Sequence, residues 1–211
     1  MTRQFYIGDT HFGHASIISL CQRPFASIEE HDEALIDNWN RTVGQDDIVW
    51  MLGDFSYKGQ PKLIRRLFER LNGAQKHLVY GNHDHRGSDP RSVTSTMQLP
   101  WTSQGHYAET VDSSVRIVMC HYGMRVWPGM HRGALHFFGH SHTRLTGTRQ
   151  CIDVGVDNFN YMPVDLQTIR ARLAKLPALD IVEGTDAVEG LEVEPFGQFV
   201  EDGSTNEGWS P

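Results

Sequence analysis

Five short motifs rich in Asp, Asn and His each follow an apolar run of residues. In an open α/β sheet, ligands bind at the edge formed by the carboxyl ends of the strands. If the apolar runs are strands, the polar side chains that follow them meet at that edge. In chain order the motifs are Asp9-Thr10-His11, Gly53-Asp54, Gly81-Asn82-His83-Asp84, His121 and Gly139-His140-Ser141-His142.

The donor types in these motifs define the chemistry. Carboxylate, amide oxygen and imidazole without thiolate suit Mn²⁺, Fe, Zn²⁺ or Co²⁺. Two such ions about 3.5–4 Å apart need a bridging carboxylate, and such pairs serve the hydrolysis of phosphate esters. On extended chain, the Asp-x-His and His-x-His pairs would each point their two side chains the same way. A lone His at a strand end is more often a structural hydrogen-bonding residue, but five ordered motifs favour a metal site.

The elements that must position these motifs alternate in type along the first part of the chain. Strands are predicted at residues 4–8, 47–52 and 76–80, and helices at 28–42 and 61–71. Ser27 is the expected N-cap of the first helix. This alternation within about 80 residues predicts a parallel α/β core.

The second part of the chain has a different pattern, with strand-like runs, turns and little helix. Asp112-Ser113 lies between two of these runs and predicts a hairpin turn. This part predicts a mixed or antiparallel sheet packed beside the first. The predicted strands are residues 106–111, 114–120, 134–138 and 150–154, and a helix is predicted at 165–176.

Charge and composition bound the class of protein. The 211 residues carry a formal net charge of −7, and residues 177–211 hold nine acidic side chains and no Lys or Arg. Two regions are therefore predicted: a catalytic domain at 1–176 with a net charge of +2, and an acidic tail at 177–211 that is partly disordered or docked on the core. The absence of a basic stripe argues against long duplex nucleic acid.

Several other function classes are excluded by absent patterns. No apolar run reaches the ~18 residues of a membrane span, and no signal peptide is recognised. The three cysteines form no C-x-x-C pair, so a cytoplasmic location is expected. The sequence has neither G-x-S-x-G nor G-K-[ST], which excludes a typical serine hydrolase and a P-loop protein. The oligomeric state is left open.

The ordered set D-x-H, G-D, G-N-H-D, H and G-H-x-H resembles the calcineurin-like metallophosphoesterase superfamily. It spans Asp9 to His142. The resemblance implies a four-layer α/β/β/α sandwich with two mixed β-sheets, and a centre of two divalent metal ions. Mn²⁺ is the expected ion, with Fe, Zn²⁺, Co²⁺ and Ni²⁺ as alternatives. By the resemblance, the first ion is bound by Asp9, His11 and His142, the second by Asn82, His121 and His140, and Asp54 bridges both.

The resemblance also implies how the reaction proceeds. Hydroxide bound to the metal pair would attack phosphorus, and His83 would act as the general acid toward the leaving oxygen or stabilise the transition state. Asp84 would fix the tautomer and orientation of His83.

Candidate residues for binding a small phosphoester substrate come from two loops. His14 follows the first motif closely enough to face the same pocket, and Arg125 and Arg132 lie in the loop 122–133, where Trp127 offers a stacking face. Each of these also has a simpler structural interpretation. Hydrolysis of phosphodiester bonds in small substrates, nucleotides among them, is the leading prediction. A nucleotide pyrophosphohydrolase, a phosphomonoesterase and a non-catalytic scaffold of the same fold are the alternatives.

Overall fold

The computed structural model of the chain describes residues 2–85 and 93–178. The predicted acidic tail therefore lies, except for its first two residues, outside the described residues. Within the described ranges the structure contains two β-sheets, four α-helices and two short 3₁₀ helices. This agrees with the predicted α/β fold with two mixed sheets.

The first sheet is built around the three predicted parallel strands. β1 (Gln4–Ile7) pairs with β2 (Ile48–Met51), and β2 pairs with β3 (Gln75–Val79), all in parallel. Two short edge strands that the sequence pattern did not predict complete it: β4 (Ser103–Gly105) is parallel to β3, and β9 (Val164–Asp165) is antiparallel to β1. The sheet order is β4-β3-β2-β1-β9.

The second sheet has the order β5-β6-β7-β8 and is mixed. Its first pair is an antiparallel hairpin, and the other two pairs are parallel. The hairpin turns at Ser113 and Ser114, whose φ angles of 47° and 65° match the left-handed conformation of a tight hairpin turn. The turn therefore lies one residue beyond the predicted Asp112-Ser113. The four strands are β5 (Tyr107–Asp112), β6 (Val115–Cys120), β7 (Leu135–Phe138) and β8 (Cys151–Asp153).

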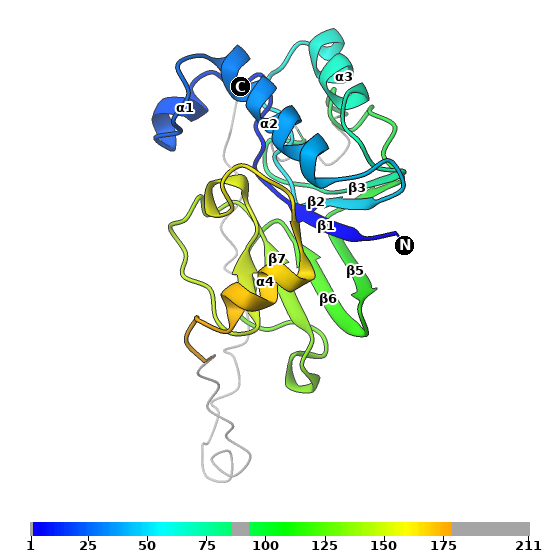
Figure 1. Ribbon diagram of the computed structural model, residues 1–211, viewed down its shortest axis with the longest axis vertical. Coiled ribbons are helices and arrows are strands. Elements are labelled where there is room, and N and C mark those ends of the chain that lie inside the picture. The colour runs from blue at the N-terminus through cyan, green and yellow to red at the C-terminus, as the bar shows by residue number, and fades with distance from the viewer. Residues whose placement is uncertain (1, 86–92, 179–211) are drawn as a thin grey trace, which may run out of the picture. The chain divides into compact units, whose positions relative to one another are not determined.

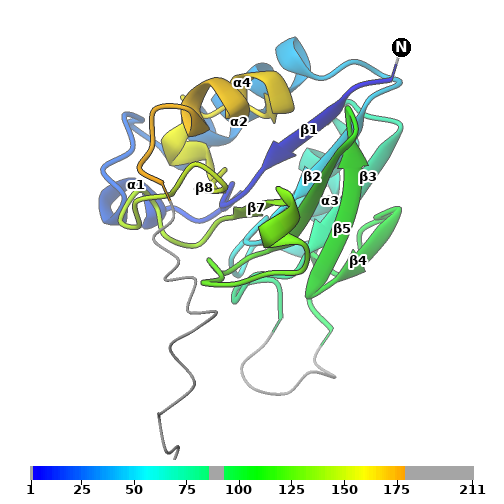
Figure 2. The ribbon, with the colours of Figure 1, turned by 90° about the horizontal axis from the view of Figure 1, so that it is seen from below.

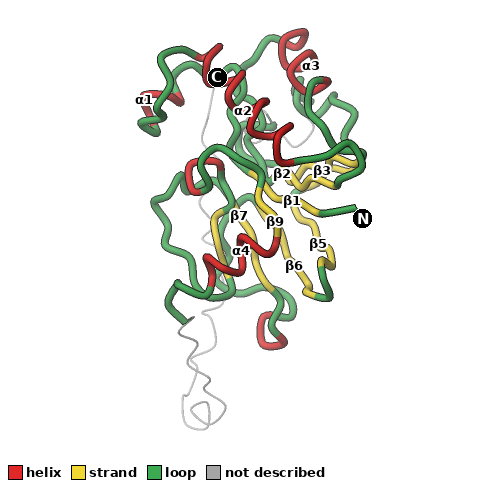
Figure 3. Tube along the Cα trace, viewed as in Figure 1, coloured by secondary structure: helices red, strands yellow, loops and turns green. Residues whose placement is uncertain are grey.

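Two helices form the layer outside the first sheet. α2 (Ile28–Thr42) begins where predicted, because the Ser27 hydroxyl accepts a hydrogen bond of 3.2 Å from the backbone N–H of Glu30. α3 (Pro61–Glu69) begins at Pro61, where proline suits the first turn. Both helices lie over β1–β3 in Figures 1 and 3. Their buried faces share one hydrophobic core with the outer face of that sheet.

A second core lies between the two sheets. Tyr6 of β1 meets Phe137 of β7 edge to face, with ring centroids 4.9 Å apart. α4 (Leu166–Leu173), shown beside the strands in Figure 2, packs its apolar side chains into this same core. The outer face of the second sheet is covered by the segment 124–134, which includes the 3₁₀ helix η1 (Met130–Arg132) and the buried Trp127.

The two sheets are joined directly at the edge that carries the motifs. Just after β7, the backbone N–H of His140 donates to the carboxylate of Asp9, which follows β1, and Val156, after β8, donates its N–H to the carbonyl of Gly8. A bridge between Gly8 and Gly155 links the first sheet to the chain that follows β8. The carboxyl ends of strands from both sheets are therefore held side by side.

Candidate metal centre

The structure brings the seven predicted ligand side chains to one place. Four groups of described residues have ligand atoms that all lie within 4.8 Å of one another, and three of them consist of motif residues: Asp9 with His11 and His142, His11 with Asp54 and His83, and Asp54 with His121 and His140. The fourth is Cys21 with His142 and Asp157. Asn82 joins the group of Asp54, His121 and His140, since its Oδ1 atom lies 3.2 Å from His121 Nε2. These segments are separated by up to 133 residues of sequence, so the fold alone makes them neighbours.

The local backbone of the ligands differs from the prediction. The Asp-x-His and His-x-His pairs were expected on extended chain, but five ligands have positive φ angles: 57° for Asp9, 53° for His11, 57° for Asp54, 66° for His140 and 45° for His142. Residues other than glycine seldom adopt this left-handed conformation, and such residues cluster at functional sites. The chain turns sharply after each strand, and the turn aims the side chain into the centre.

Two of the glycines beside ligands are required by close packing. A Cβ atom on Gly53, which has a φ of 88°, would lie 2.3 Å from the ring of His121. A Cβ atom on Gly81 would lie 2.2 Å from Asp54 Oδ1. These distances are below any normal contact, so only glycine lets the neighbouring ligands approach this closely.

Asp54 lies at the junction of the groups. Its Oδ2 atom is 3.4 Å from His121 Nε2, 3.7 Å from His11 Nε2 and 3.9 Å from His83 Nε2. Burial raises the pKa of Asp54, but the hydrogen bond and charge of His121 and the charge of His11 outweigh it, so the net pKa lies well below its ordinary value. Burial likewise lowers the pKa of His121, but its interactions with Asp54 and Asp9 raise it to about 9. The Asp54 carboxylate and the His121 imidazole therefore each favour the charged form of the other.

Asp9 is fully buried beneath the other half of the centre. Both of its carboxylate oxygens accept the backbone N–H of His140, at 3.0 and 2.9 Å. Burial raises the pKa of Asp9 to about 7, although the charges of His121 and His142 act in the opposite direction. A buried carboxylate with so little compensating positive charge is what a cation would neutralise.

Two of the histidines are held in the manner of metal ligands. The Nδ1 atom of His121 lies 2.7 Å from the Leu52 carbonyl oxygen, and Nδ1 of His142 lies 2.7 Å from a carboxylate oxygen of Asp157. A hydrogen bond at Nδ1 fixes the ring and leaves Nε2 free to bind a metal. Nε2 of His142 faces Asp9 Oδ1 at 3.8 Å.

His11 provides the clearest test of whether these residues fit a metal. Its Nε2 atom is buried and has no hydrogen-bond partner. An unsatisfied buried polar atom is costly. Ligand atoms about 2.0–2.2 Å from a shared ion lie roughly 3–4 Å from one another, as Nε2 of His11 and Oδ2 of Asp54 do. A cation between them would satisfy both atoms, so the donor set fits divalent metal.

His14, predicted as a substrate residue, is at the centre. It is buried, with its Nδ1 atom 3.2 Å from His11 Nδ1 and its Nε2 atom 2.9 Å from the Ser16 hydroxyl. Burial and the charge of His83 lower the pKa of His14 to about 4. A neutral His14 therefore supports the ring of His11 from behind.

His83 is half-buried on the open side of the centre. Its backbone N–H donates to Asp54 Oδ1 at 2.8 Å, and its ring lies against Tyr57, with centroids 4.3 Å apart. Burial lowers the pKa of His83, and the charge of Asp54 partly offsets this. Geometry alone places the ring where it could reach either a metal or a bound phosphate.

The structure corrects the expected contacts of Asp84. The carboxylate was expected to orient the ring of His83, but it accepts the backbone N–H groups of Asp54, Gly81 and Phe55, at 2.7, 2.9 and 3.1 Å. Burial raises its pKa to about 7. Asp84 therefore fixes the turn that carries Asp54.

The predicted substrate loop is not brought to the centre in the expected way. Trp127 is buried under the second sheet, where its indole N–H donates to the Ala134 carbonyl, so it offers no stacking face. Arg132 ends η1, three residues before β7 begins, whereas the ligands His140 and His142 follow the other end of β7. Arg125 is exposed. Among described residues, no hydrogen bond or ion pair joins either arginine to a ligand.

A buried network behind Asp9 and His142 was missed. The Arg23 guanidinium binds Asp157 at two points, both at 2.9 Å, and also donates to the carbonyl oxygens of Asp9 and Thr10. With these partners and His31 at 2.8 Å, the guanidinium has no free face for substrate. Asp157 lies four residues after β8 and is thus a fourth acidic residue shortly after a strand, which was the available signal.

Comparison with known proteins gives matches over this part of the chain. A model of the calcineurin-like phosphoesterase family matches residues 3–166. An uncharacterised protein of Methanocaldococcus jannaschii is 34% identical over 180 residues, covering 80% of this chain and 90% of that protein. The Gene 66 protein of Mycobacterium phage D29 is 27% identical over 190 residues, covering 78% and 94%.

Among solved structures, a protein of unknown function from Aquifex aeolicus has the same fold. Its TM-score is 0.60 at 22% identity, and the match covers 82% of this chain and all of that one. Across residues 2–85 and 93–178, the helices are too short or too polar for any of them to cross a bilayer.

Proposed function

Because the chain belongs to the calcineurin-like phosphoesterase family and is thus a metal-dependent hydrolase of phosphate esters, we propose that it hydrolyses phosphodiester bonds of small substrates at a centre of two metal ions. Asp9, His11 and His142 hold the first ion. Asn82, His121 and His140 hold the second, and Asp54 bridges the two.

The position of Asp54 carries this proposal. It belongs to two ligand groups, one with His11 and one with His121 and His140, while Asp9, His11 and His142 form a group beside them. A carboxylate shared between neighbouring groups is the arrangement that a pair of ions requires. The donors are carboxylate, amide and imidazole, which favours Mn²⁺, with Fe, Zn²⁺, Co²⁺ and Ni²⁺ as alternatives.

The chain's own groups then orient the substrate and move the proton. Two bound ions supply polarisation of the phosphoryl oxygens and an activated nucleophile at neutral pH. His83, on the open side, donates a proton from its imidazole to the leaving oxygen. A phosphate anion beside the ring raises the pKa of His83 and so favours the charged form that can donate. The preference for diesters rests on this acid, because a diester with a poor leaving group needs a proton donor.

The proposal is tested with bis(p-nitrophenyl) phosphate, p-nitrophenyl phosphate and a dinucleoside polyphosphate, each with Mn²⁺. We expect the highest kcat/KM on the diester, loss of activity with a chelator, and recovery when Mn²⁺ is restored. Metal analysis of the active protein should give two ions per chain. A higher kcat/KM on the monoester or the polyphosphate would contradict diester specificity, and activity with only one bound ion would contradict the paired centre.

The variant His83→Ala tests whether His83 donates a proton or binds a metal ion. We expect two bound ions to remain and the rate on a diester with a poor leaving group to fall by about 10²–10⁴-fold. The rate on a nitrophenyl diester should fall much less, because nitrophenolate leaves without a proton. An equal loss on both substrates, or loss of a metal ion, would assign His83 to the metal instead.

A further inference from the structure

A large cavity opens beside the proposed proton donor. It has a volume of about 880 Å³, and Asn82 and His83 form part of its wall. This is within the usual range for a small-molecule site. Because His83 is proposed to protonate the leaving oxygen, the leaving group of the substrate would lie in this cavity. This step rests on the proposed function.

The lining of this cavity suits a polar leaving group. Tyr57, Ser95 and Gln98 contribute hydroxyl and amide groups. Within the described residues, none of these three side-chain groups has a hydrogen-bond partner in the chain. A nucleoside offers hydroxyls and ring heteroatoms as partners for such groups.

A second hollow adjoins the first and is basic. It has a volume of about 460 Å³, and its charged lining residues are Lys58, Lys62 and Arg66. Lys58, Gly59 and Gln60 line both hollows, so only this short segment separates them. No acidic residue is among the described lining residues of either hollow.

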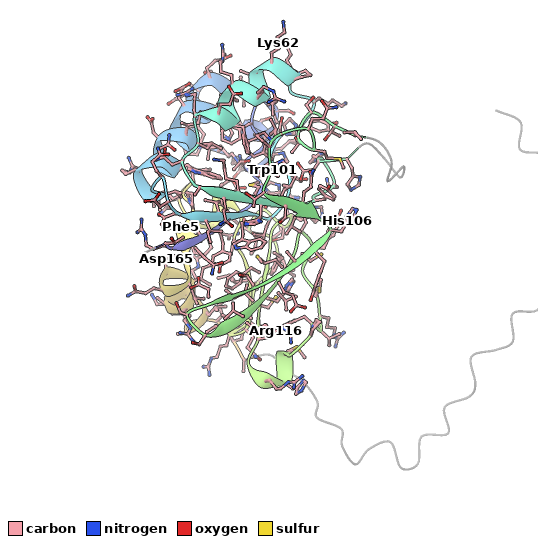
Figure 4. All side chains as sticks on the ribbon, turned by 90° about the vertical axis from the view of Figure 1, so that its right-hand side faces the viewer. Phe5, Lys62, Trp101, His106, Arg116 and Asp165 are labelled. Atoms are coloured by element: carbon pink, nitrogen blue, oxygen red, sulfur yellow. The ribbon has the colours of Figure 1, made fainter. Side chains whose placement is uncertain are left out.

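None of the three cations makes an ion pair with a carboxylate in the described part of the chain, although Arg66 lies near enough to Glu33 to lower the pKa of that carboxyl. Within the described residues, no ion pair or hydrogen bond engages the side chain of Lys62 or Arg66, and Figure 4 shows Lys62 extending from α3 into solvent. Lys58 Nζ lies over the ring of Tyr57, 4.9 Å from its centroid. Glu33 of α2 is held by Arg70 in a two-point ion pair, at 2.6 and 2.5 Å.

The chain just before the segment between the hollows is anchored by hydrogen bonds, and Gly59 packs closely on α3. The Ser56 hydroxyl donates to the Phe12 carbonyl at 2.8 Å, and Phe12 N–H donates to the Phe55 carbonyl at 2.8 Å. A Cβ atom on Gly59 would lie 2.5 Å from Ile64. Lys58 follows this anchored stretch of chain and lines both the leaving-group cavity and the basic hollow.

From this juxtaposition we infer that the substrate carries a second phosphate, one nucleoside beyond the bond that is cut, and that the basic hollow binds it. Short single-stranded oligonucleotides have this spacing. In a nucleoside polyphosphate the next phosphorus is joined to the first through one oxygen, so it would stay at the metal centre and leave the basic hollow empty. The chemistry is that of phosphate recognition by Lys and Arg.

The test compares the dinucleotide TpT with the same dinucleotide phosphorylated at its 3′ or its 5′ end, with Mn²⁺ present. Chromatography of the products separates cleavage of the internal diester from loss of the terminal phosphate. We expect kcat/KM for the internal bond to rise about tenfold with one of the two terminal phosphates, the scale of one charge-assisted contact. In wild-type protein, added NaCl should reduce this advantage more than it reduces cleavage of TpT.

Reversing the charge of two residues in the basic hollow tests whether the terminal phosphate binds there. In the double variant Lys62→Glu/Arg66→Glu the tenfold advantage should disappear. The matched control is Arg170→Glu/Lys175→Glu, which makes the same change in net charge on and after α4, whose apolar face belongs to the other core. The control should keep the advantage.

Each outcome decides between the two proposals. If no diester is hydrolysed, the proposed function fails. If TpT is hydrolysed but neither terminal phosphate accelerates it, or if both double variants lose the advantage equally, the inference fails and the proposed function stands. A dinucleoside pyrophosphate is the remaining comparison. If its kcat/KM exceeds that of TpT, and if this difference disappears in Lys62→Glu/Arg66→Glu, the assignment of the substrate to a nucleotide strand is overturned. If Lys62→Glu/Arg66→Glu does not fold, the wild-type protein tests the inference. Added NaCl must then reduce the advantage of the terminal phosphate more than it reduces cleavage of TpT, and an equal reduction overturns the inference.

Discussion

The two halves of the candidate centre are built differently. The first half, Asp9 with His11 and His142, rests on the buried Arg23–Asp157 pair. The second half, Asn82 with His121 and His140, has a backbone carbonyl behind His121, and the side chain of His140 is exposed. The first half is therefore held by buried charged groups, whereas the second half has a ligand side chain in contact with solvent.

This difference predicts that the two halves bind their metal ions with different affinities. Side chains that are held by buried hydrogen bonds lose little freedom when they bind a metal, so the first half should bind its ion more tightly. The second half borders the leaving-group cavity through Asn82 and should exchange its ion more readily. The following predictions test this comparison, beginning with the largest expected effect.

Asp54→Asn should affect both halves at once. The change removes the negative charge that lies 3.4 Å from His121 and 3.7 Å from His11. We expect activity to fall by more than the 10–100-fold that loss of a supporting hydrogen bond usually costs, to roughly 10³-fold or beyond. Metal analysis and steady-state kinetics measure it. Near-normal activity with two bound ions would remove Asp54 from its bridging position.

Arg23→Met should destabilise the fold through the first half. The guanidinium is fully buried, and its loss removes the cation that pairs with the buried Asp157 carboxylate and the contact with His31. We expect the free energy of unfolding to fall by about 3–5 kcal/mol, measured by denaturant titration with a chelator present. Arg116→Met breaks the exposed pair with Glu109 and should cost no more than about 1 kcal/mol. Similar losses in the two variants would refute the proposed importance of the buried pair.

His140→Ala should separate the halves by metal content. Removing this exposed side chain takes one ligand from the second half only, so bound metal should fall from two ions per chain to one, with the affinity of the second ion weakened more than about 100-fold. His142→Ala should weaken the tighter ion instead. His131→Ala, on η1, is the control and should change neither. Equal loss of both ions in His140→Ala would show that the two halves bind as one unit.

Asp157→Asn should give the smallest effect on metal binding, although it also removes the carboxylate partner of the buried Arg23 guanidinium and should lower the stability of the fold. The carboxylate accepts a hydrogen bond of 2.7 Å from His142 Nδ1, and the amide keeps the shape without the charge. We expect affinity for the first ion to fall by about 10–100-fold, measured by competition with a chelator. Asp112→Asn, in the hairpin turn region, is the control. An unchanged affinity would mean that the network supports folding rather than the metal.

Some features of the fold were predictable because they depend on local sequence. α2 begins after Ser27 as expected, since a hydroxyl at that position caps the first turn. The three central strands were predicted because their buried residues form short apolar runs. β4 and β9 were missed because they have three and two residues and exist only by pairing with β3 and β1.

The sequence by itself determined which side chains are available at the strand ends and which chemistry their types allow, because apolar runs and the residues that follow them are local features. Only the tertiary structure decided what each group touches. Asp84 binds three backbone N–H groups rather than His83, Arg23 lies buried against Asp157, and Trp127 packs beneath the second sheet. These partners are distant in the chain, and hydrogen bonds and burial depend on distance in space.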